Sequence, residues 1–72
     1  MKTTSSLQTI AYAGGSVIVS ATKYTSSSLQ SIANACKSSG SSLIVKNADE
    51  LTISSCQSIA SANPGLVYFD FT

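Results

Sequence analysis

Few side chains in this chain could carry out catalysis or bind a metal. The 72 residues include no His, and the only carboxylate side chains are those of Asp49, Glu50 and Asp70. A nucleophilic serine needs a base and an orienting acid, so the 16 serines lack their usual base. Structural zinc sites take four ligands, mostly from Cys and His, and two Cys do not complete such a set. We therefore predict no catalytic residue, no metal ligand and no bound cofactor, and we expect that the protein is not an enzyme.

Two short motifs have a structural explanation that is simpler than a chemical one. Asp49 and Glu50 are adjacent and stand before an expected helix, where carboxylates interact favourably with the helix dipole. Gly14-Gly15-Ser16 follows an expected helix and precedes an expected strand. That order is the reverse of the one that places a phosphate at a helix N-terminus. We interpret the two glycines as the end of a helix.

The elements that position these residues come from a segment that occurs three times. The copies start at Ser6, Ser28 and Ser55 and read SLQTIAYA, SLQSIANA and SCQSIASA. A short apolar segment follows each copy, at residues 17–19, 43–45 and 66–69. The copies are 22 and then 27 residues apart, a length at which each repeat forms one supersecondary unit. We predict a single domain, residues 1–72, with units at about 3–24, 25–51 and 52–72.

Each copy predicts one amphipathic helix. Small and apolar residues recur at i, i+3, i+4 and i+7, with one polar exception at Asn63: Leu7, Ile10, Ala11, Gly14; Leu29, Ile32, Ala33, Cys36; and Cys56, Ile59, Ala60, Asn63. We expect the N-caps to be Thr4, Thr25 and Thr52, which precede these stripes. Helix-breaking residues follow at 14–15, 39–40 and 63–65.

The apolar segments after the breakers predict strands, because they are short and rich in β-branched and aromatic residues. Helix and strand thus alternate three times. Right-handed crossovers between parallel strands place every helix on the same face when the strand order is 1-2-3. We therefore predict an α/β fold, a three-stranded parallel sheet of order 1-2-3 with three helices on one face, which forms a short two-layer solenoid.

The face without helices is the candidate interaction surface. Alignment of Ala21 with Ala48 directs Val17, Val19, Ile44 and Lys46 toward the helices. The opposite set forms the candidate interaction face: Ile18, Ser20, Leu43, Val45, Asn47, Leu66, Tyr68 and Asp70. An error of one residue in register would exchange the two faces of a strand.

Composition limits the partners of that face. Only 10% of the residues are charged and the formal net charge is +1, so no basic surface is available for nucleic acid. No apolar run approaches the roughly 18 residues of a membrane span. Strands that are apolar on both sides are typical of sheets covered on both faces. We expect no contact with nucleic acid or membrane, and we predict a homo-oligomer, with another protein as the alternative partner.

The two cysteines and the amino-terminal segment bear on the compartment. Cys56 takes the position of Leu7 and Leu29, and Cys36 lies on the same stripe as Leu29. Two helical turns, about 10 Å, would separate the thiols, so we expect both to be free and buried. Residues 1–21 have some features of a signal peptide, but they contain the first repeat, so we expect them to be retained. We predict a cytoplasmic protein, with secretion as the alternative.

These observations lead to two hypotheses about function. The first is a small non-enzymatic repeat module that acts through protein–protein contact and associates with itself through its open sheet face or edge. The alternative is an exported protein that uses a Ser/Thr/Asn-rich face to bind polysaccharide or another hydroxylated surface. The compartment and the solution mass distinguish the two.

The repeat predicts how the protein responds to changes at Cys56. Cys56→Leu restores the residue of the other two copies, so we expect an unchanged or slightly increased free energy of unfolding. Cys56→Ser places a hydroxyl on the buried stripe, and we expect a loss of about 1–3 kcal/mol. Urea unfolding measures both changes. Equal stability of the two variants would contradict the alignment of Cys56 with Leu7 and Leu29.

Overall fold

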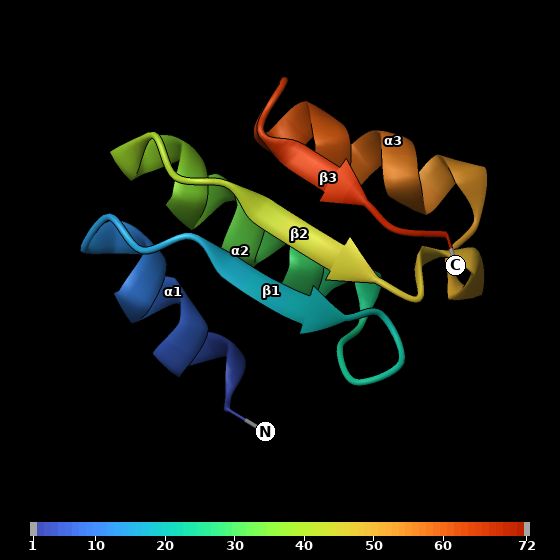
Figure 1. Cartoon of the computed structure of the whole chain (residues 1–72), viewed down its shortest axis with the longest axis horizontal. Coiled ribbons are helices and arrows are strands. Elements are labelled where there is room, and N and C mark those ends of the chain that lie inside the picture. Colours follow the sequence, from blue (N-terminus) through green and yellow to red (C-terminus); the bar gives the residue numbers. More distant parts are fainter. Residues whose placement is uncertain (1, 72) are drawn as a thin grey trace.

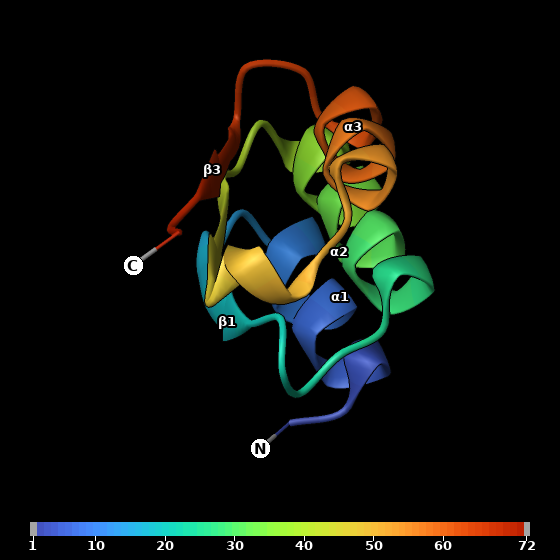
Figure 2. The same ribbon diagram turned by 90° about the vertical axis from the view of Figure 1, so that its right-hand side faces the viewer.

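The chain alternates helix and strand three times in the computed structural model, which describes residues 2–71. The elements are α1 (Thr4–Tyr12), β1 (Val17–Ser20), α2 (Ser26–Ser39), β2 (Leu43–Lys46), the 3-10 helix η1 (Ala48–Glu50), α3 (Ile53–Ala62) and β3 (Val67–Phe69). The strands form one parallel sheet of order β1-β2-β3 (Figure 1). Figure 2 shows the three helices on the same side of this sheet. The predicted α/β class, strand order and helix placement are confirmed.

The three helices begin with the same capping arrangement. The N-caps are Thr3, Thr25 and Thr52, each with an extended backbone. Each Thr hydroxyl accepts a hydrogen bond from the backbone N–H three residues later, at 3.1–3.2 Å, which satisfies one of the unpaired donors of the first turn. Thr4, predicted as the first cap, is instead the first helical residue. The reason is spacing, because Thr3 stands four residues before Leu7, as Thr25 stands four before Leu29.

The helices end at the predicted breakers. α2 ends at Gly40, whose φ of 76° is in the left-handed region that favours glycine. The N–H of Gly40 and that of Ser41 return to carbonyls of the last turn, at Lys37 and Cys36. α2 has 14 residues and α1 has 9, which accounts for most of the longer second repeat.

The core lies between the sheet and the helices, with α2 at its centre. The predicted stripe of α2 is completely buried, since Leu29, Ile32, Ala33 and Cys36 are all 0% exposed. Leu7, Ala11, Cys56 and Ile59 extend the buried stripe to the other two helices. Three stripe residues are not buried: Gly14 is exposed, Ala60 is half-buried, and Ile10 is 44% exposed because α1 has a neighbouring helix on one side only among the described residues.

The polar member of the α3 stripe is also buried, and it has a partner. Asn63 is 2% exposed, and its side-chain N–H donates to the backbone carbonyl of Ser41 at 3.0 Å. Ser41 lies in the loop between α2 and β2. A buried amide that pairs with a backbone carbonyl avoids the cost of an unsatisfied polar group, so Asn63 links the third unit to the second.

The register of β2 differs from the prediction. Val17 pairs with Leu43 and Val19 with Val45, so all four side chains point into the core together. Leu43 and Val45 were expected on the open face, and both are 0% exposed. The alignment of Ala21 with Ala48 was therefore wrong by one residue. Asn47, with a left-handed φ of 57°, adds a residue between β2 and the next buried alanine.

The central position of α2 predicts which isoleucine matters most for stability. Ile32→Ala should lower the free energy of unfolding by about 2–5 kcal/mol, because it removes a fully buried side chain and leaves a cavity. Ile10→Ala is the matched control, since Ile10 has the same position in the first repeat but is partly exposed, and a loss of about 1 kcal/mol is expected. Urea unfolding at low protein concentration compares the two. Equal losses would contradict the central role of α2.

Candidate functional site: the open face of the sheet

The open face of the sheet carries an apolar row that crosses all three strands. Ile18 of β1 pairs with Ile44 of β2, and Ile44 pairs with Tyr68 of β3. Ile18 is 62% exposed and Tyr68 is 53% exposed, while Ile44 between them is half-buried. We call these three residues the apolar row. It lies on the face opposite the helices.

Polar residues border the apolar row at the carboxyl ends of the strands. Ser20 and Lys46 are paired in the register, and Asp70 follows β3 on the same face. The side-chain amide of Asn47 donates to the hydroxyl of Ser20 at 2.8 Å. Backbone hydrogen bonds from Asp70 to Val45 and from Ala48 to Asp70 hold this end of the sheet together. The border therefore has one cation and one anion, and the face has no strong field of either sign.

Serines dominate the other border of the apolar row. Ser16 and Ser42 precede Val17 and Leu43, which are paired, and Leu66 stands before β3. The hydroxyl of Ser16 accepts a hydrogen bond from the backbone N–H of Ser42 at 3.0 Å. This border is uncharged, so the apolar row lies between a neutral edge and a weakly charged one.

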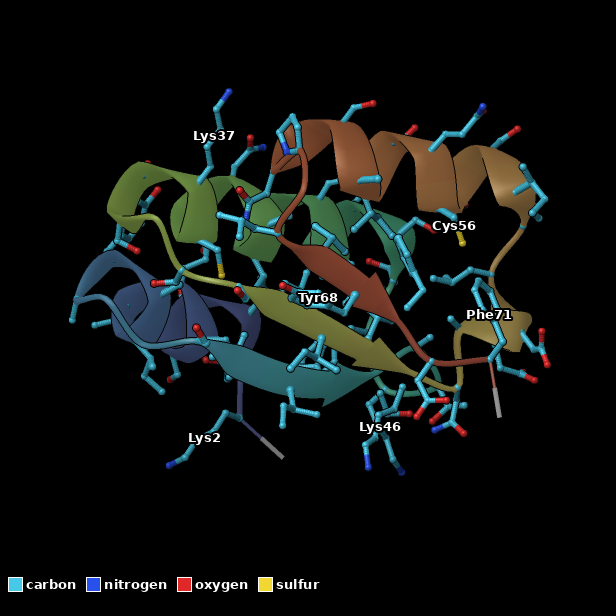
Figure 3. All side chains as sticks on the ribbon, turned by 45° about the horizontal axis from the view of Figure 1, so that its top comes forward. Lys2, Lys37, Lys46, Cys56, Tyr68 and Phe71 are labelled. Atoms are coloured by element: carbon cyan, nitrogen blue, oxygen red, sulfur yellow. The ribbon has the colours of Figure 1, made fainter. Side chains whose placement is uncertain are left out.

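The residues of β1 and β3 that were predicted for the open face lie there, whereas those predicted for β2 lie in the core. Ile18, Ser20 and Tyr68 lie on the open face, with Leu66 and Asp70 half-buried beside them. Asn47 is exposed in the turn after β2. Leu43 and Val45 belong to the core, and Ile44 and Lys46 take their place on the open face. Direct alignment of the two apolar tripeptides, Val17-Ile18-Val19 with Leu43-Ile44-Val45, would have found Ile44. Figure 3 shows Tyr68 and Lys46 on the strands, away from Cys56 on α3.

The residues with reactive side chains lie away from this face. Cys36 and Cys56 are free and buried, as predicted. Burial raises the pKa of the Cys36 thiol, and its S–H donates to the carbonyl of Ser42 at 3.6 Å. A protonated, buried thiol is a poor nucleophile. Asp49 and Glu50 are exposed on η1.

Within residues 2–71 we find neither a pocket nor a group of three His, Cys, Asp or Glu side chains that could hold a metal. None of the helices described is long and apolar enough to cross a membrane. The features that remain for binding are flat, exposed surfaces. An exposed apolar row between an uncharged border and a weakly charged one is suited to contact with another macromolecular surface.

No protein-family model, curated protein or solved structure matches this chain. The function must therefore be inferred from the surfaces of the molecule itself.

The corrected register makes a prediction about stability. Leu43→Ala should lower the free energy of unfolding by about 2–5 kcal/mol, because Leu43 is 0% exposed. Ile18→Ala should cost about 1 kcal/mol or less, since Ile18 projects from the open face and loses mainly strand propensity. Denaturant melts of the two variants at low concentration provide the test. Similarly small losses for the two variants would favour the register predicted from the alanines, which places both residues on the open face.

Proposed function

We propose that this protein is a small non-enzymatic repeat module that acts through protein–protein contact, and that its first partner is a second copy of itself. The observation that carries the proposal is the apolar row of Ile18, Ile44 and Tyr68, which lies uncovered on the face opposite the helices. A continuous exposed apolar patch on a small protein marks an interaction site. Three repeats of one helix–strand unit, stacked as a short solenoid, form the support for this face.

Because the core of the single chain is small, burial of the open sheet face by another molecule is favourable. A chain of this length buries only about 60% of the surface that it exposes when unfolded. The sheet has helices on one side, although its strands are apolar on both. Removal of the apolar row from water contributes about 25 cal/mol for each Å² buried. Association thus adds to a hydrophobic core that is small in the single chain.

A second copy fits this face because the face can complement itself. A two-fold axis through Ile44 and along the apolar row places the row of one copy on the row of the other, in an isologous contact. The same axis brings the border with Lys46 opposite the serine border of the partner copy. Like charges then stay apart, and the single Lys and Asp of the face impose little repulsion.

The free thiols favour a reducing compartment for this module. Cys36 and Cys56 are both free and buried. Free thiols are typical of proteins in reducing compartments. We therefore place the proposed self-association in the cytoplasm.

Substitution of the apolar row tests the proposal. Ile18→Thr/Tyr68→Thr keeps residues of high strand propensity but removes most exposed apolar surface from the row. We expect sedimentation velocity at micromolar concentration to show association of the wild-type chain, and the double variant to associate at least roughly tenfold more weakly.

Tyr12→Asn is the matched control. Tyr12 is an aromatic residue that is 59% exposed on α1, away from the sheet, and Asn34 takes its place in the second repeat. Its association should equal that of the wild-type chain. A monomeric wild-type chain at high concentration, or association that the double variant leaves unchanged, would overturn the proposal.

A further inference from the structure

The two ends of the stack of units resemble the internal surfaces by which the units contact one another. Within the chain, α2 has one side toward the preceding unit and one toward the following unit. Hydrogen bonds identify these sides, because the hydroxyl of Ser26 on α2 donates to that of Ser55 on α3 at 3.0 Å. The side-chain amide of Gln8 on α1 donates to the carbonyl of Ser31 on α2 at 3.5 Å. Repeat positions equivalent to Ser26 and Gln8 therefore face the following unit.

The side of α1 that faces away from α2 carries Ser6 and Thr9, the equivalents of Ser55 and Ser31, and beside them two exposed apolar residues. Ile10 is 44% exposed and Ala13 is exposed. The equivalent residues of the second repeat, Ile32 and Ala35, are 0% exposed, and Ile32 lies in the helix that packs between α1 and α3. We call Ile10 and Ala13 the leading flank. It presents residues that the second unit buries.

At the opposite end of the stack, α3 exposes a second surface with apolar residues. Ile53 is equivalent to Ser26, which faces the following unit, and it is 72% exposed. Ala60 is half-exposed, whereas its equivalents Ala11 and Ala33 are 0% exposed. We call Ile53, Gln57 and Ala60 the trailing flank. Neither flank carries a charged residue, so their contact requires no desolvation of charge.

The outer edges of β1 and β3 present backbone groups that can form hydrogen bonds with each other. The N–H groups of core-facing residues in β1 and β2 donate to the following strand, from Val17 to the carbonyl of Ser42 and from Leu43 to that of Leu66. Alternate residues of a strand in a parallel sheet bond to opposite neighbours. The N–H groups of Val67 and Phe69 in β3 therefore point away from β2, and in β1 the carbonyl of Ile18 does so as well. The edge of β3 can thus continue the sheet into β1 of another copy, with Val67 beside Val17.

We propose that the trailing flank of one copy binds the leading flank of a second copy, so that α3 and β3 of the first contact α1 and β1 of the second. This contact repeats the packing already present between the units of one chain. It differs from the face contact proposed above, because it joins two different surfaces and has no two-fold axis. A head-to-tail contact of this kind leaves one free flank at each end, so it extends into chains of copies.

Two variants that block opposite ends test this inference. Both are made in the Ile18→Thr/Tyr68→Thr background, so that contact through the apolar row does not contribute. Ala13→Lys blocks the leading flank and Ile53→Lys blocks the trailing flank, and both positions are exposed. The Ile18→Thr/Tyr68→Thr variant, in which both flanks are intact, should sediment with an average mass that rises with protein concentration and reaches no plateau. Each blocked variant alone should sediment as a monomer, and an equimolar mixture should form a 1:1 heterodimer and nothing larger.

Controls separate the contact from general effects of lysine. Ser54→Lys adds the same charge on α3, next to Ile53, at a position that is exposed in all three repeats, and should keep the association of the background. Circular dichroism confirms that each variant is folded, and Ile10→Lys provides a second block of the leading flank. A mixture that stays monomeric, or blocked variants that still associate alone, would overturn the head-to-tail contact. Neither result bears on the face contact, which is tested by the Ile18→Thr/Tyr68→Thr substitutions themselves.

Discussion

The structure depends on the close packing of α2 between two helices and the sheet. Leu29, Ile32 and Ala33 on α2 are 0% exposed, and so are Leu43 and Val45 on the strand that follows. α1 and α3 each lie against α2, and β1 and β3 each pair with β2. The outer units therefore bury their apolar stripes against the middle unit. A helix so placed needs small side chains, which explains why alanine recurs in every copy of the repeat.

Hydroxyl and amide side chains form the hydrogen bonds that cap the helices and link the units. The Thr caps satisfy the first turns of the helices, and Asn63 satisfies the carbonyl of Ser41 at the boundary between two units. Among the described residues no buried side-chain nitrogen or oxygen lacks a hydrogen-bond partner. A chain with 10% charged residues is thus compatible with an interior in which the buried side-chain nitrogen and oxygen atoms are paired.

The surfaces that stay open follow from the way in which the core is built. One helix layer covers one face of the sheet, which leaves the apolar row of Ile18, Ile44 and Tyr68 on the other. Neighbouring units bury the flanks that face each other. The outer flanks of the first and third units have no such neighbour, so Ile10 and Ile53 are exposed at opposite ends. In the proposed assemblies, the face binds the same face of a second copy, whereas the two flanks bind each other. The two proposed contacts extend in different directions, and separate substitutions are expected to block each of them.

The sequence by itself determined the three helices and strands, their order, the helix ends, the caps at Thr25 and Thr52, and the burial of both thiols. These features depend on local spacing and turn chemistry, which a repeated segment displays three times. Only the tertiary structure decided which side of β2 faces the helices. Leu43-Ile44-Val45 is apolar at every position, so alternation of side chains carried no signal, and the left-handed Asn47 shifted the alignment by one residue. Because successive side chains of a strand point to opposite faces, that single residue moved Leu43 and Val45 into the core and Ile44 and Lys46 onto the open face.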